Sequence, residues 1–141
     1  MMIWPSTTLS AELHIHAARL AVWEKFTRLR EWPQWQPEVT SATWQVADRW
    51  QEGAQFSLQQ GRQQRHYLIR MVAVGTVTVW EAATGAAVYS LQLSDQLGGC
   101  KVVLRCTVHG FGSVGAFLER GRQSAALRQT LAQLKHIVER K

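Results

Sequence analysis

The sequence predicts a single α+β domain. A curved antiparallel sheet of seven strands wraps around a long C-terminal helix, with two short helices between strands 1 and 2. Three observations predict this fold. Residues 8–16 alternate between apolar and polar side chains, as in a half-buried strand. Six more strand-like segments follow between residues 39 and 109 with no helical pattern among them. Residues 113–141 then carry apolar side chains at helical spacing.

A helical segment and an aromatic corner follow the first strand. Apolar side chains recur at helical spacing within residues 17–29, at Leu20, Trp23, Phe26 and Leu29. Pro33 restricts the backbone of Trp32 and cannot donate a helical hydrogen bond, so this helix is expected to end near Glu31. Residues 32–37 then form a short corner that is rich in tryptophan and proline.

The remaining strands are separated by turn residues, mostly glycines with polar neighbours. The expected strands are 39–47, 54–60, 65–74, 76–82, 86–94 and 100–109. Because the connections between them are short, each strand should pair antiparallel with the next. The last two strands each have one strongly apolar face and one mainly polar face, so one side of the sheet should cover a core and the other should meet water.

The final helix has an unusual distribution of side-chain size. Ser113 is a suitable N-cap, and the stretch to Lys141 would be roughly 40 Å long at about 1.5 Å per residue. Its apolar stripe is bulky at both ends and small in the middle, at Gly121, Ser124 and Ala125. There, either the helix and the sheet approach closely or a space remains. An empty space of about 300 Å³ would cost on the order of 7 kcal/mol, so a ligand, ordered water or inward collapse should fill it.

Composition bounds the class of protein. A chain of 141 residues with 46% hydrophobic and 18% charged side chains fits one globular domain spanning residues 1–141. No apolar run approaches the ~20 residues needed to cross a bilayer, and residues 1–8 lack the pattern of a signal peptide. We therefore expect a cytoplasmic location.

Nucleic-acid binding, a disulfide bond and a metal site are not expected. The net charge of +6 comes from scattered basic residues without a nucleic-acid-binding motif, so we expect no nucleic-acid partner. Cys100 and Cys106 would lie near 20 Å apart along one strand, which makes them free thiols. Glu12, His14 and His16 share a strand face, but no third strong ligand accompanies the two histidines, so we expect no metal site and no cofactor.

The chain resembles a known family over nearly its whole length. The residues that carry the resemblance are 17–23, the Trp-Pro-Gln-Trp-Gln-Pro corner within 30–39, and segments 50–53, 79–80, 98–102 and 131–139. The order of elements is similar to the helix-grip fold of the START and birch-pollen-allergen superfamily, and the chain more closely resembles the polyketide cyclase/dehydrase and lipid-transport (SRPBCC) proteins. Where relatives often have Gly-Thr after the sixth strand, this chain has Gly99-Cys100.

The resemblance implies a hydrophobic tunnel between the sheet and the final helix, without implying one activity. Relatives include cyclases, lipid and hormone binders, and coenzyme-Q chaperones. Strand alternation places Tyr89 on the inner face with its apolar neighbours, and it predicts that Tyr67 and Met71 face inward because their face of the strand is the more apolar one. Trp80 and Glu81 lie on opposite faces, so only one of them can face inward, and we choose Trp80. The predicted ligand-binding residues are Trp35, Phe56, Tyr67, Met71, Trp80, Tyr89, Leu91, Leu104, Cys106, Phe117, Gly121, Ser124 and Ala125.

Three functional hypotheses follow. The first is a carrier or sensor of a small apolar molecule, such as a lipid, a quinone or an aromatic metabolite. The second is a cyclase or dehydratase acting on a polyketide-like substrate, which needs a titratable group inside the cavity; no catalytic constellation is readable. The third is an interaction module whose basic final helix docks on an acidic protein or a membrane surface. Monomer and dimer both stay open.

Overall fold

The structure, a computed structural model, describes residues 6–109 and 120–140. The elements are β1 (Ser6–Ile15), α1 (Arg19–Thr27), η1 (Leu29–Glu31, a 3₁₀ turn), α2 (Trp32–Trp35), β2 (Ser41–Val46), β3 (Gln55–Gln60), β4 (Gln63–Ala73), β5 (Val77–Ala82), β6 (Ala87–Gln96), β7 (Gly99–His109) and α4 (Arg120–Glu139). The predicted α+β class, the seven strands and the short helices between strands 1 and 2 are confirmed. The expected N-cap Ser113 and the candidate Phe117 lie outside the described residues.

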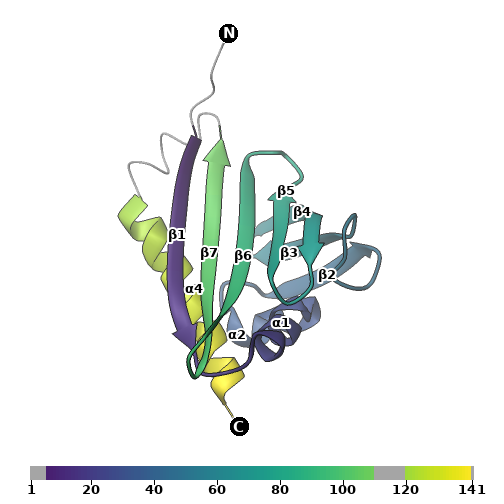
Figure 1. Ribbon diagram of the computed structural model, residues 1–141. Helices are drawn as coiled ribbons and strands as arrows, with labels where there is room; N and C mark the ends of the chain where they lie inside the picture. The colour runs from purple at the N-terminus through teal and green to yellow at the C-terminus, as the bar shows by residue number, and fades with distance from the viewer. Residues whose placement is uncertain (1–5, 110–119, 141) are drawn as a thin grey trace.

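The seven strands form one antiparallel sheet in the order β1-β7-β6-β5-β4-β3-β2. Strands β2 to β7 therefore form a meander, and β1 returns to pair with the last strand, with Leu9 opposite Cys106 and Ile15 opposite Cys100. Helix α4 lies across β1 and β7, and α1 and α2 lie near its C-terminal half (Figure 1). At that end, Lys135 Nζ donates a hydrogen bond to the carbonyl oxygen of His14 at 3.0 Å.

The short helices differ in detail from the prediction because of the corner that follows them. Helix α1 ends at Thr27, and Pro33 lies in the first turn of a separate helix, α2, where its missing N–H costs nothing. The buried indole Nε1 of Trp32 donates to the carbonyl oxygen of Phe26 at 2.7 Å, which fixes the corner against α1. Leu20, predicted on the buried stripe, is exposed, whereas Val22 is fully buried.

An aromatic cluster forms the core where the short helices meet β3, β4 and β5. Its members have ring centroids 5.2–5.8 Å apart for most pairs, and they are Phe26, Trp32, Trp50, Phe56 and Trp80. Most of these pairs are tilted or edge to face, the arrangements that aromatic quadrupoles favour. The cluster holds the short helices on the concave face of the sheet and leaves the region under α4 to smaller side chains. None of the helices in the described residues is both long and apolar enough to span a bilayer.

Candidate functional site

A cavity of about 270 Å³ lies between the concave face of the sheet and α4. Eight elements, α1, α2, β3 to β7 and α4, contribute to its wall, together with the loop after α2. The lining residues are Phe26, Trp32, Gln36, Glu38, Leu58, Gln60, Tyr67, Trp80, Tyr89, Leu104, Ala126, Leu127 and Thr130. Most of these side chains are apolar or aromatic, which is typical of sites for small organic molecules. We call this space the interior cavity.

Neighbouring strands provide the floor of the interior cavity. Trp80 of β5 lies directly opposite Tyr89 of β6, and directly opposed residues share a face of the sheet. Their rings are stacked, with centroids 5.6 Å apart and planes inclined by 9°. Leu104 of β7 and Tyr67 of β4 continue this surface on either side. The floor is therefore largely aromatic and contains two phenol groups.

Helix α4 provides the roof through Ala126, Leu127 and Thr130. Thr130 Oγ1 donates a hydrogen bond to the carbonyl oxygen of Ala126 one turn earlier, at 3.1 Å, so the hydroxyl offers a ligand only acceptor capacity. One turn further on, Leu131 and Leu134 are fully buried against the sheet and fix the helix there. Ala126 is exposed and borders the cavity from its solvent side, whereas the leucines at positions 131 and 134 fill the space under the helix.

Polar side chains gather where the interior cavity meets solvent. Glu38 is exposed and Gln60 is half-buried, whereas Gln36 is buried although it is polar. All three line the cavity, and they come from the loop after α2 and from the end of β3. These residues form an opening through which a ligand could enter, with amide and carboxylate groups at its rim.

The two phenol groups of the cavity stay protonated at neutral pH. Burial raises the pKa of Tyr67, and the nearby positive charge of Arg65 partly opposes that rise. Burial raises the pKa of Tyr89 further, with Cys106 and Tyr67 as weaker contributors. Burial also raises the pKa of the Cys106 thiol, so Cys106 is not an activated nucleophile. The interior cavity therefore offers neutral hydroxyl groups, which can donate a hydrogen bond to a ligand.

A second cavity of about 290 Å³ adjoins the first beyond the two tyrosines. Tyr67 and Tyr89 line both spaces, so their rings form the partition between them. The outer space is formed by the start of β4 and the β5–β6 turn, and its lining includes Arg65. We call it the outer chamber.

The predicted ligand-binding residues divide between this site and other places. Tyr67, Trp80, Tyr89 and Leu104 line the interior cavity together. Leu91 and Cys106 lie on the same face of the sheet but are buried in the core, and Phe56 is buried in the aromatic cluster. Trp35 packs on Phe26 and borders a separate groove beside α4, with Gln133 and His136. On α4, Ser124 is not among the lining residues that the structure describes, and Ala125 is exposed; the prediction for Gly121 falls where the structure describes only the backbone.

Met71 points away from the interior cavity because the pairing of β4 with β5 contains a β-bulge. Ile69 lies opposite Trp80 and Met71 lies opposite Val79, so Arg70 is an extra residue on β4. The bulge reverses the alternation beyond it. As a result Ile69 is fully buried, whereas Met71 is on the outer side and exposed.

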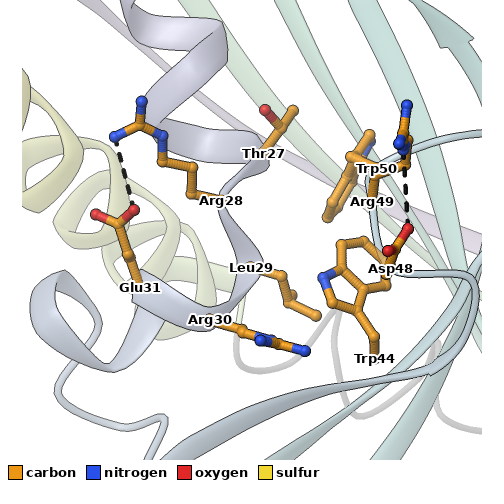
Figure 2. A pocket seen from close by; sticks show the side chains of 9 residues that line it. All are labelled: Thr27, Arg28, Leu29, Arg30, Glu31, Trp44, Asp48, Arg49 and Trp50. Carbon is orange, nitrogen blue, oxygen red and sulfur yellow. Dashed lines mark ion pairs between the residues drawn. The ribbon is translucent and has the colours of Figure 1, made fainter.

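A surface cleft larger than the interior cavity lies outside the sheet–helix space, between η1 and the loop before β3. It has a volume of about 510 Å³ and carries three arginines and two acids around Trp44 and Trp50. Arg28 and Arg49 reach toward their own acidic partners on opposite sides of the cleft, Glu31 at 3.7 Å and Asp48 at 3.8 Å (Figure 2). Trp50 closes its inner wall, and its Nε1 donates to Thr78 Oγ1 at 2.8 Å. Its charges are mostly paired and solvated, so we place the candidate site in the interior cavity.

No metal centre is formed by the described residues, among which no three His, Cys, Asp or Glu side chains come together. His14 and His16 do lie close, with ring centroids 4.6 Å apart, and His14 Nδ1 shares a hydrogen bond with Gln96 Oε1 at 2.7 Å. Cys100 and Cys106 are both buried and unpaired. These side chains therefore contribute to packing and surface hydrogen bonding.

Comparison with known proteins identifies relatives of the whole chain. The sequence profile of the family described as polyketide cyclase / dehydrase and lipid transport matches residues 6–139. No curated protein matches the sequence.

Several solved structures share the fold at low sequence identity. StfQ, a di-domain ARO/CYC from the steffimycin biosynthetic pathway, is 14% identical with a TM-score of 0.77; the match covers 95% of this chain and 51% of StfQ, so the chain spans about half the length of that protein. BH1534 of Bacillus halodurans is 14% identical with a TM-score of 0.77, and the match covers 98% and 100% of the two chains. Norcoclaurine synthase from Thalictrum flavum, solved with dopamine and hydroxybenzaldehyde, is 10% identical with a TM-score of 0.74 over 98% and 90%.

Proposed function

The chain belongs to the polyketide cyclase/dehydrase and lipid-transport family, and we propose that it binds and carries a small hydrophobic molecule in the interior cavity. The observation that carries this proposal is a space of about 270 Å³ between sheet and helix whose wall is mostly apolar. Burial of a ligand's apolar surface at about 25 cal/mol per Å² would supply most of the affinity.

The shape and chemistry of the floor favour a ligand with a flat apolar part. The Trp80 and Tyr89 rings stack on each other and give the cavity an aromatic wall, against which a planar ring or an acyl chain can pack. The neutral hydroxyl groups of Tyr67 and Tyr89 can orient a carbonyl or hydroxyl group on the ligand. A quinone, an aromatic metabolite or a short lipid meets both requirements.

A direct test is to identify what the protein carries when it is purified from cells. Native mass spectrometry of the intact protein, followed by solvent extraction, is expected to reveal a bound apolar compound that is recovered unchanged. An interior that holds only water, together with no binding of added quinones, aromatic compounds or fatty acids, would contradict the proposal.

A cyclase or dehydratase is the second candidate, and the two buried tyrosines favour it. A neutral phenol can donate a hydrogen bond to a substrate carbonyl while negative charge develops on the oxygen, which promotes enolisation. Glu38 at the rim is a carboxylate that could accept the released proton. Under this proposal a linear poly-β-ketone incubated with the protein is converted to a cyclic or dehydrated product, and Tyr67→Phe slows the conversion more than it weakens binding. Recovery of the unchanged compound would exclude the enzyme and leave the carrier.

A further inference from the structure

The outer chamber differs from the interior cavity in one respect that bears on the ligand. It contains a basic side chain, Arg65, beside the partition formed by Tyr67 and Tyr89. Arg65 lies directly opposite Leu58 in the β3–β4 pairing, and Leu58 is a buried residue of the interior cavity. Directly opposed residues share a face, so the Arg65 side chain is on the concave, ligand-facing side of the sheet.

Arg65 lacks an acidic partner among the described residues. Its guanidinium donates from Nη2 to Gln63 Oε1 at 2.8 Å, also interacts with the Tyr67 hydroxyl, and takes part in none of the ion pairs formed by the described residues. The arginines on the outer face of the sheet differ from each other. Arg105 of β7 donates to Gln92 Oε1 at 3.2 Å and, like Arg65, takes part in none of these ion pairs. Arg70, on the same strand as Arg65 but at the bulge, pairs with Glu81 at 2.6 Å on the outer face.

We infer that Arg65 recognises an acidic group at one end of the ligand, so that the molecule carried is an amphiphile with an apolar body and a carboxylate. This inference rests on the proposed function and narrows its ligand class. The apolar body lies in the interior cavity on Trp80, and the chain passes the edge of the tyrosine pair. The carboxylate then meets the guanidinium in the outer chamber, where a charge-assisted and potentially bidentate hydrogen bond is available.

The two tyrosines make such an arrangement feasible without a permanent channel. Their rings contact each other edge to face with centroids 6.0 Å apart, and Tyr89 is half-buried. Under this proposal the ligand passes between the two spaces when a rotation of the Tyr89 side chain opens the partition. Both hydroxyl groups are neutral and can donate to the same carboxylate. Recognition of the carboxylate would therefore combine the Arg65 guanidinium with two neutral hydroxyl donors.

The test compares one acid with its neutral amide. Isothermal titration calorimetry with 6-phenylhexanoate and 6-phenylhexanamide keeps the apolar body constant and changes only the charged end. The wild-type protein is expected to bind the acid roughly five- to tenfold more tightly than the amide, because a hydrogen bond to a charged group is stronger than one between neutral groups. In Arg65→Gln this preference should disappear while the affinity for the amide stays unchanged.

Arg62→Gln is the matched control, because it removes the same charge from the adjacent β3–β4 turn, where Arg62 is exposed and lines neither cavity. It should keep the preference for the acid. Equal affinities for acid and amide in the wild-type protein, unaltered by Arg65→Gln, would overturn the role of Arg65 and leave the carrier proposal intact. Equal losses of acid binding in both variants would also overturn it, since net charge alone would then explain the preference. Absence of binding for both compounds would contradict the carrier proposal itself.

Discussion

Tyr67 and Tyr89 lie edge to face with ring centroids 6.0 Å apart, and each of them lines both the interior cavity and the outer chamber. They come from β4 and β6, which are separated in the sheet by β5. Their contact across that strand is direct because the concave face brings the two rings together over Ala82 and Trp80, their opposed neighbours on β5. The chemistry of the site centres on this pair.

The first prediction concerns the volume of the cavity. Ala126→Phe places a ring in the interior cavity and should weaken binding of 2-naphthol at least tenfold by calorimetry, because the ring occupies the space of the ligand. Ala125→Phe is the control, since Ala125 and Ala126 are both exposed but only Ala126 lines the cavity. Both substitutions lower helix propensity by about 0.5 kcal/mol, so a difference in affinity between the two variants reports the effect of filling the cavity. Similar affinities for the two variants would contradict the placement of the site.

The second prediction concerns pH. The chain has two tyrosines, and both have a raised pKa, so phenolate absorbance of the folded protein should not develop near pH 10. The unfolded chain should titrate there, because unperturbed tyrosine has a pKa of about 10. The folded state then holds more protons than the unfolded state, so the free energy of unfolding is unaffected below that pH and falls as the pH rises above it. A native titration with a midpoint near 10 would show that the phenols are open to solvent.

A third prediction concerns the hydrogen bonds behind the aromatic cluster. Thr78 is fully buried; its hydroxyl accepts from Trp50 Nε1 at 2.8 Å and donates to the carbonyl oxygen of Met71 at 2.9 Å. Thr78→Val leaves that indole N–H and carbonyl oxygen unpaired and should cost about 1–3 kcal/mol in the free energy of unfolding, measured with urea. Thr107→Val removes an exposed hydroxyl pair with Thr8 and should cost less than about 1 kcal/mol. Equal costs would contradict the structural role of Thr78.

A fourth prediction concerns the turn before β7. A Cβ at Gly99 would overlap the carbonyl oxygen of Ile15, which belongs to the paired strand β1. Gly99→Ala should therefore destabilise the fold by more than about 3 kcal/mol, since backbone on both sides must move. At Gly98 a Cβ meets nothing, and only its φ of +79° opposes alanine, so Gly98→Ala should cost about 1–2 kcal/mol. Thermal unfolding of the two variants measures the difference, and a milder effect at Gly99 would contradict the close β1–β7 contact.

Local periodicity predicts most of the fold and the floor of the site. The period of two places Trp80, Tyr89 and Leu104 on the concave face, and the structure lines the interior cavity with all three. The same rule fails at Met71, because one extra residue at Arg70 reverses the alternation and nothing in the local sequence marks that bulge. Alternation is therefore reliable along a strand until the pairing shifts.

The roof and the rim of the site are harder to predict. The small residues Ser124 and Ala125 suggest where α4 leaves space, but among the side chains that the structure describes, the helix lines the cavity through Ala126, Leu127 and Thr130. A helix turns by about 100° per residue, so an error of one position in the predicted apolar stripe assigns the cavity to a different face of the helix. Gln36 and Gln60 border the opening because sheet curvature brings the α2 loop beside the end of β3, a long-range relation that no local pattern encodes.

The measurement that tests the central claim most directly is nuclear magnetic resonance mapping of the bound probe. Titration of 2-naphthol into the isotope-labelled protein should shift the backbone amide signals of Leu104, Leu127 and Thr130 and leave those of Arg28, Arg30 and Arg49 in the surface cleft unchanged. Shifts confined to the cleft, or no shifts up to the solubility limit of the probe, would contradict a ligand site between the sheet and α4.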